Sequence, residues 1–269
     1  MTADQSRLVR RRLLMTLGVV GAWVVGLGGL APTASAQGIQ SQQWYLKAMR
    51  AQEMHEVSTG KGIKVAVIDT GVDPSTPSLR GQVLPGKDVS GAPGDETEDD
   101  NGHGTSMAEL IAGTGRKGSL RGLAPDAKII PITSTLSGVK GDSAISRTDR
   151  AIRAAADSDA QIISMSFGSP GSDSRERAAV KYAARKGKLL FASAGNDAKK
   201  GNFPLYPASL DDVAGIGALD SAGKVAEYST YGPHVALTAP GLGVPGWCDG
   251  AKVRYCVQGQ GGTSSATAL

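Results

Sequence analysis

Short apolar runs separated by segments of helical spacing make up most of the chain after residue 60. The runs are flanked by Gly, Pro or Asp, which is typical of strands buried on both faces. Residues 141–159 and 172–187 carry helical spacing, with Ser or Asp positioned as caps and Gly187 as a stop. This alternation predicts an α/β domain, in which a mainly parallel sheet has helices on both faces. The expected strands are 63–68, 128–133, 161–167, 188–195 and 212–219.

The first 36 residues follow a different pattern. The basic segment RLVRRR precedes the apolar run LLMTLGVVGAWVVGLGGL, and ASA stands before Gln37 as a small-residue cleavage site. We predict a signal peptide at 1–36, a short polar lead-in at 37–60 and a single domain at 61–269. The alternative is a leader that stays attached as an anchor, since roughly 20 apolar residues cross a bilayer. In both cases we expect an exported protein, secreted or in the cell envelope.

Charge gives no indication of a nucleic-acid partner. The chain holds 29 Lys and Arg against 25 Asp and Glu. Four of the basic residues and one of the acidic residues lie in the leader, which leaves 25 against 24 in the rest of the chain. Because a nearly balanced chain lacks the basic surface that binds phosphates, we expect no nucleic acid among its partners.

Two cysteines, Cys248 and Cys256, flank the segment DGAKVRY. This segment predicts two short strands around an Asp249-Gly250 turn. In an oxidising compartment, a disulfide that closes the hairpin is favoured over free thiols. A metal site is least favoured, because no histidine lies nearby in the sequence.

The segment SGAPGDETEDDNG, residues 90–102, is strongly acidic. We expect a solvated loop here. A cation site is the alternative, but the carboxylates lack a regular ligand spacing.

The stretch VAVIDTGVD ends an apolar run with Asp69. Because ligands of an open α/β sheet bind beyond the carboxyl ends of its strands, Asp69 is expected in a site. Asp-Thr-Gly presents the carboxylate of an aspartic protease, and it could also present the acid of a serine-protease triad. The aspartic interpretation needs a second carboxylate to share a proton. The chain has no second Asp-Thr-Gly or Asp-Ser-Gly, so that interpretation lacks its partner.

Two further motifs supply the partners of a serine triad. NGHGTSMAELIAG puts His103 between two glycines at the front of an expected helix, and GQGGTSSATAL puts Ser264 after a glycine-rich turn. Taken alone, Ser264 could simply cap a helix. Together with Asp69 and His103, each in its own glycine-flanked turn, it is better explained by catalysis. For His55 and His234 we expect ordinary surface or packing roles.

These three motifs resemble the active-site motifs of the subtilases, the subtilisin-like serine proteases, in that family's order of Asp, His and Ser. The resemblance runs from about residue 44 to the end of the chain. It implies a subtilisin-like three-layer α/β fold and a secreted endopeptidase that acts on protein or peptide substrates. By this resemblance Ser264 is the nucleophile, His103 the general base and Asp69 the carboxylate that orients the imidazole. The chemistry requires no cofactor. Structural calcium is common in the family, but no calcium or other metal site can be identified in this sequence.

Two further segments resemble the family's substrate-binding parts. FASAGND, residues 191–197, is similar to its oxyanion-hole segment and nominates Asn196 as a donor to the developing oxyanion. SMSFGSP resembles the segment whose edge pairs with substrate backbone, and nominates Ser166, Phe167 and Gly168 as one wall of the pocket. Residues 135–141 are the expected opposite wall.

The chain also departs from the family's pattern. It stops at Leu269, five residues past Ser264, and Ala268 stands where a proline is usual. We therefore expect a domain that is incomplete at its C-terminus. The alternative function is a catalytically impaired subtilase-fold domain that binds peptides. The lead-in resembles the mature start of the mycosins, the membrane-anchored subtilases of type VII secretion, so membrane association is expected only through an uncleaved leader or a missing C-terminal anchor.

Overall fold

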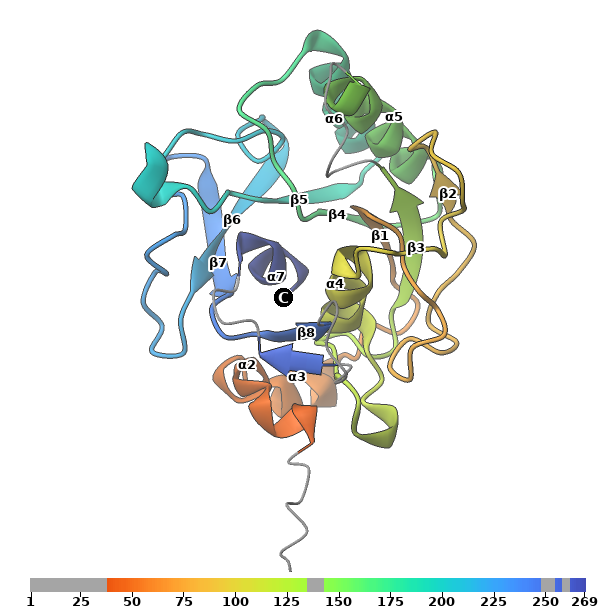
Figure 1. Ribbon diagram of the computed structural model, residues 1–269, viewed down its shortest axis with the longest axis vertical. Helices are drawn as coiled ribbons and strands as arrows, with labels where there is room; N and C mark the ends of the chain where they lie inside the picture. The colour runs from red at the N-terminus through yellow and green to blue at the C-terminus, as the bar shows by residue number, and fades with distance from the viewer. Residues whose placement is uncertain (1–37, 135–142, 248–254, 258–261) are drawn as a thin grey trace, which may run out of the picture. The chain divides into compact units, whose positions relative to one another are not determined.

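The computed structural model describes residues 38–134, 143–247, 255–257 and 262–269 (Figure 1). The predicted signal peptide at 1–36, the predicted pocket wall at 135–141 and Cys248 therefore lie outside the described residues. In the described part of the chain, no helix combines the length and the apolar character needed to cross a membrane.

A parallel sheet forms the centre of the domain, with the strand order β2-β3-β1-β4-β5-β6-β7. All five strands expected from the sequence are present, and β2 and β7 extend the sheet at its two edges. The observed fold is therefore the α/β architecture that the sequence predicts. The strands are β1 (Lys64–Asp69), β2 (Lys87–Asp88), β3 (Lys128–Thr133), β4 (Ile162–Met165), β5 (Leu189–Ser193), β6 (Val213–Leu219) and β7 (Val235–Pro240).

Helices cover both faces of this sheet (Figure 1). On β1, Ala66 and Ile68 pack into one apolar cluster with α5 (Ser143–Asp157) and α6 (Ser174–Arg185). The alternate residues, Val65 and Val67, pack on the opposite face with α4 (His103–Ala112). Successive side chains of a strand point to opposite faces, so a strand that is apolar throughout requires a helix on each side. The short helix α7 (Thr263–Ala268) packs beside α4 and against β5, β6 and β7.

The lead-in packs against the domain. It forms the 3-10 turn η1 (Ile39–Gln42) and the helices α2 (Trp44–Ala48) and α3 (Ala51–Val57). The indole nitrogen of Trp44 donates to the carbonyls of Leu242 and Gly243, at 3.2 and 3.1 Å, and the Tyr45 side chain is fully buried. The lead-in therefore packs as part of the core of the domain.

A small antiparallel hairpin packs near α4. Strand β8 (Pro245–Trp247) pairs with β9 (Tyr255–Val257), and Gly246 lies opposite Cys256. The hydroxyl of Tyr255 donates to the buried carboxylate of Glu109 on α4, at 2.7 Å. The predicted pair of antiparallel strands is present, but Trp247 lies opposite Tyr255, so a longer connection than the predicted two-residue turn at Asp249-Gly250 joins them. The disulfide stays a prediction because Cys248 is not among the described residues. Two 3-10 turns, η2 (Arg116–Gly118) and η3 (Ala198–Lys200), complete the described elements.

Candidate active site

The carboxylate of Asp69 is at the carboxyl end of β1 and is almost fully buried, with 1% of the residue exposed. Its Oδ1 lies 2.7 Å from Nδ1 of His103 and accepts from the backbone N–H of Thr70 at 2.8 Å. An ionised carboxylate can only accept, so Nδ1 of the imidazole carries the proton. In the neutral ring this leaves Nε2 as the basic nitrogen.

The backbone around Gly104 sets this geometry. Helix α4 begins at His103, as expected, directly after Gly102 in the left-handed region at φ 77°. A Cβ atom on Gly104 would lie 2.2 Å from the carbonyl oxygen of Gly71 and 2.9 Å from Cβ of Asp69. Only glycine allows the first turn of α4 to approach the end of β1 this closely.

The surroundings of His103 change the pKa of its imidazole in two opposite directions. Burial by itself lowers the pKa of His103, because it penalises the charged ring. The charge of Asp69, the hydrogen bond to it and the charge of Asp99 together outweigh burial, so the pKa is raised above 6.5. The ring remains partly accessible, with 32% of its side chain exposed, so a substrate can reach it.

Asp99 connects the residue after β1 to the start of α4 by hydrogen bonds. The sequence analysis did not identify this residue. Its Oδ1 accepts from the Thr70 hydroxyl at 2.7 Å and from Gly102 N at 2.8 Å. Its Oδ2 accepts from Thr105, from N at 2.8 Å and from Oγ1 at 2.6 Å. The expectation of a merely solvated loop is therefore wrong for this residue, because its carboxylate caps α4 and ties the helix to the residue after Asp69. The available signal was an Asp a few residues before a helix start.

Ser264 lies in the first turn of α7, next to β4. Its hydroxyl donates to the carbonyl of Ser166 at 3.0 Å, and the hydroxyl of Ser166 donates to the carbonyl of Ser264 at 3.2 Å. Ser264 is not the helix cap, since Gly262 holds that position without a side-chain cap. Between the described side chains of Ser264 and His103 there is no hydrogen bond, although their helices pack side by side (Figure 1). A direct hydrogen bond thus joins Asp69 to His103. Ser264 lies on α7, which packs beside α4, the helix that begins with His103.

Asn196 follows β5 and faces the turn before Ser264. Its Oδ1 accepts from Thr263, from N at 2.9 Å and from Oγ1 at 3.1 Å. This fixes the orientation of the amide and turns its Nδ2 away from Thr263. The side chain is exposed, so the amide N–H groups are free to meet a substrate.

The predicted substrate wall lies where β4 ends. Ser166 is buried against Ser264, Phe167 is half-buried against the core, and Gly168 is exposed beside Leu205. Of these three residues, Ser166 contacts the Ser264 turn directly. The opposite wall expected at 135–141 is outside the described residues.

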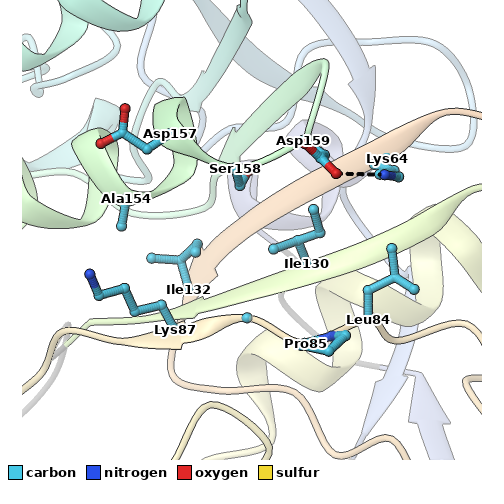
Figure 2. A pocket seen from close by; sticks show the side chains of 11 residues that line it. Lys64, Leu84, Pro85, Lys87, Ile130, Ile132, Ala154, Asp157, Ser158 and Asp159 are labelled. Carbon is cyan, nitrogen blue, oxygen red and sulfur yellow. Dashed lines mark hydrogen bonds and ion pairs between the residues drawn. The ribbon is translucent and has the colours of Figure 1, made fainter.

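A hollow on another part of the described surface contains none of the predicted site residues. The hollow in Figure 2, of about 490 Å³, lies beside β1, β3 and the end of α5. Lys64 and Asp159 on its rim form an ion pair at 3.0 Å. Within the described ranges, no group of three or more His, Cys, Asp or Glu side chains is positioned to hold a metal ion.

Comparison with known proteins gives matches along most of the chain. The model of the subtilase family matches residues 60–269. The chain is 36% identical over 203 residues to the major intracellular serine protease of Bacillus subtilis (strain 168), and the match covers 73% of this chain and 63% of that protein. It is 32% identical over 203 residues to thermitase of Thermoactinomyces vulgaris, covering 75% and 71% of the two chains. With the thermophilic serine proteinase of Bacillus sp. (strain AK1), at 35% identity, the match covers 77% of this chain but about half, 49%, of that protein.

Solved structures agree with the fold. MycP1, described as an essential component of the type VII (ESX-1) secretion system, matches with a TM-score of 0.72 at 29% identity, covering 87% of this chain and 76% of that one. MycP3, a protease from the type VII (ESX-3) secretion system, matches with a TM-score of 0.71 at 28% identity, covering 88% and 76%. The similarity of this chain to MycP1 and MycP3 supports a mycosin-like subtilase, which the lead-in also suggests.

Proposed function

This chain belongs to the subtilase family, and from that premise we propose that it is an exported serine endopeptidase that cleaves peptide bonds through an acyl-enzyme intermediate. Its substrates are proteins or peptides. The observation that carries the proposal is the hydrogen bond of 2.7 Å between Asp69 and His103. It leaves Nε2 of a partly exposed imidazole as a base beside the helix that bears Ser264.

In the first half of the proposed reaction, Nε2 of His103 takes the hydroxyl proton of Ser264 as Oγ bonds to the substrate carbonyl carbon. To do so, the Ser264 hydroxyl turns away from its present acceptor, the carbonyl of Ser166. His103 then gives the proton to the leaving amine as the C–N bond breaks. The product of this half is an ester on Ser264 and a free amine.

In the second half, water attacks the ester while His103 accepts one of its protons. The ester C–O bond breaks, the proton returns to Oγ of Ser264 and the acid product leaves. Asp69 remains ionised throughout, holding the Nδ1 proton and stabilising the imidazolium that forms in each half. The raised pKa of His103 fits this role, because the carboxylates nearby favour the protonated ring.

Negative charge develops on the substrate carbonyl oxygen in both halves. We assign Asn196 Nδ2 as one donor to it, together with the backbone N–H of Ser264. The support is that Thr263 fixes Asn196 through Oδ1, which pre-orients the donor at no cost during the reaction. Ser166, Phe167 and Gly168 would bind substrate backbone at the end of β4.

Export rests on residues 1–36 of the sequence, and the relatives do not decide it, since one of them is named an intracellular protease. The alternative of a non-catalytic peptide-binding domain is weakened because the curated relatives are named serine proteases. An aspartic mechanism lacks a second carboxylate motif in the sequence.

Pre-steady-state hydrolysis of an activated peptide ester tests the proposal. We expect a burst of the released alcohol equal to the enzyme concentration, followed by slower turnover, because the acyl-enzyme accumulates. Ser264→Ala should remove both phases, whereas Ser58→Ala, an exposed serine that precedes the amino end of β1 while Asp69 lies at the carboxyl end, should keep them. Hydrolysis without a burst that survives in Ser264→Ala would overturn the mechanism.

A further inference from the structure

Residues 38–57 of the lead-in and residues 114–121 form one basic surface of the domain, which we call the lead-in face. The two segments are joined by hydrogen bonds, because Nε2 of Gln40 donates to the carbonyls of Gly115 and Ser119, at 2.7 and 2.9 Å. Together they contain five Lys and Arg against two Glu, although the chain after its leader is nearly balanced in charge. The fold therefore concentrates positive charge on this face.

Most of this positive charge is not compensated by carboxylates. Arg50 pairs with Glu53, and its Nε lies 2.8 Å from Oε1 of that residue. In the part of the chain that the structure describes, the other four basic residues of the lead-in face form no ion pair. These four are Lys47, Arg116, Lys117 and Arg121, and all are exposed. The face can therefore attract an anionic partner from solution.

The lead-in face contains a second hollow, of about 590 Å³, between α2, α3 and Arg121. Nε2 of His55 lies 2.9 Å from the carbonyl of Leu123 and must donate to it, which leaves Nδ1 to accept from Nη2 of Arg121 at 3.4 Å. Among the described residues that line the hollow, Glu53 alone carries a carboxylate, and it is already paired. The lining includes three basic side chains, Lys47, Arg50 and Arg121. Their N–H donors suit a phosphate group.

An exposed apolar stripe begins at the rim of this hollow. The backbone N–H of Met54 donates to the carbonyl of Arg50 at 3.0 Å, so Met54 lies one turn after Arg50. Val57 follows three residues later on the same side of α3. Met54 is 42% exposed and Val57 is 90% exposed. Apolar side chains beside Lys and Arg are typical of a surface that lies against a bilayer, where the apolar groups enter the headgroup boundary and the cations attract anionic lipids. A partner bound by charge alone would not require the apolar stripe.

The leader is connected to the domain at the same face. A Cβ atom on Gly38, the first described residue, would lie 4.0 Å from the carbonyl oxygen of Gly118 in η2. Residues 1–37, which include the apolar run at 13–30, continue directly from Gly38. A leader inserted in a bilayer would therefore tether the domain through a residue of the lead-in face.

We propose that the lead-in face binds the surface of a membrane that contains anionic lipids. A lipid phosphate occupies the hollow beside Arg121, and Met54 and Val57 enter the boundary between the headgroups and the acyl chains. The inference goes beyond the proposed function and does not depend on it. Binding of this kind holds the domain at a membrane without a membrane-spanning helix. It weakens with added salt, because ions screen the attraction beyond about 8 Å at physiological ionic strength.

Flotation of the full chain with lipid vesicles tests the proposal. Every variant also carries Val20→Gln, Val24→Gln and Leu27→Gln, because the apolar run of the leader would otherwise insert into any bilayer. We expect binding to vesicles of phosphatidylcholine with about 30% phosphatidylglycerol, and at least tenfold weaker binding to phosphatidylcholine alone. The arginines of the leader are common to all variants, so the comparison between variants isolates the lead-in face.

Lys47→Gln with Lys117→Gln should weaken binding to the anionic vesicles at least tenfold, since each basic side chain near such a surface contributes about fivefold. Lys47→Arg with Lys117→Arg should retain the binding. The matched control is Lys181→Gln with Arg185→Gln, two exposed residues of α6 on the opposite face of the sheet. This control should bind as the parent chain does.

Val57→Ser should weaken binding about fivefold, because it removes an apolar side chain that is buried only in the bilayer. Val225→Ser changes a valine that is 56% exposed elsewhere on the domain, and it should have no effect.

Undiminished binding of the Lys47→Gln, Lys117→Gln chain to anionic vesicles would overturn the proposal. An equal loss in the α6 control would also overturn it, since charge anywhere on the domain would then be enough. Calorimetry with inorganic phosphate and with a hexaglutamate peptide distinguishes the other anions. Saturable binding of either one, without binding to vesicles, would identify a soluble anion or an acidic protein as the ligand and overturn the membrane assignment.

Discussion

Gly104 approaches Gly71 so closely that a Cβ atom on Gly104 would lie 2.2 Å from the carbonyl oxygen of Gly71. Gly104 directly follows His103, and Gly71 lies two residues after Asp69. The contact between these two glycines therefore sets the separation of the carboxylate and the imidazole. It explains why the glycines around Asp69 and His103 belong to the site as much as the side chains do.

Gly104→Ala should damage both stability and activity. The added methyl group forces α4 away from β1, which costs about 1–3 kcal/mol of unfolding free energy, as overpacking does. It also lengthens the hydrogen bond between Asp69 and His103, and a misplacement of about 1 Å can lower kcat/KM about 10²-fold. Urea denaturation and peptide hydrolysis measure the two effects. Gly171→Ala is the matched control, because a Cβ there meets no atom within 4 Å, and a similar loss in that variant would contradict this explanation.

Asp99→Ala should destabilise the domain by about 1–3 kcal/mol, because the carboxylate caps α4 and accepts from Thr70. Asp99→Asn retains one acceptor oxygen, so its free energy of unfolding should lie between that of the unaltered chain and that of Asp99→Ala. Chemical denaturation of both variants checks the order. Asp126→Asn, an exposed carboxylate far from the site, should change the free energy of unfolding little, and equal stability of all three variants would show that Asp99 is not a cap.

The pH dependence of activity should follow His103. The ring must be neutral to act as a base, so kcat/KM should rise with pH through a pKa above 6.5. Because the charge of Asp99 is one of the contributions that raise this pKa, Asp99→Asn should move the acid limb of the profile to lower pH. A profile unchanged in Asp99→Asn would contradict this assignment.

The same shift has a consequence for stability. The pKa of His103 is higher in the folded state than its value of 6.5 in the absence of the fold. Its protonation therefore stabilises the fold fully below pH 6.5, and this contribution is lost as the pH rises through the folded pKa. Replacing His103 by Gln should flatten the pH dependence of unfolding in that window.

Asn196→Asp separates the two ends of the amide. The aspartate keeps an oxygen for Thr263 but removes the N–H donors, so a purely structural asparagine would tolerate it. We expect kcat to fall with little change in melting temperature. In subtilisin, the measured case for such a donor, its removal lowers kcat by about 10²–10³-fold. Unchanged kcat in Asn196→Asp would remove this residue from the proposed oxyanion site.

The sequence predicts the sheet well, because strands buried on both faces are apolar throughout and strand ends mark the site. Asp69, at the end of β1, and His103, at the start of α4, lie where their patterns place them. The sequence does not single out Asp99, because it is one of several acids in a loop, and only the fold shows that its carboxylate turns toward Gly102 and Thr105.

Labelling of the full chain with a fluorophosphonate tests the central claim most directly, because the probe phosphonylates an activated serine oxygen and releases fluoride. Peptide mass spectrometry should find one adduct, on Ser264, and His103→Ala should slow its formation about 10²-fold or more, since the base is lost. An adduct on another residue, or a labelling rate that His103→Ala leaves unchanged, would contradict a triad of Asp69, His103 and Ser264.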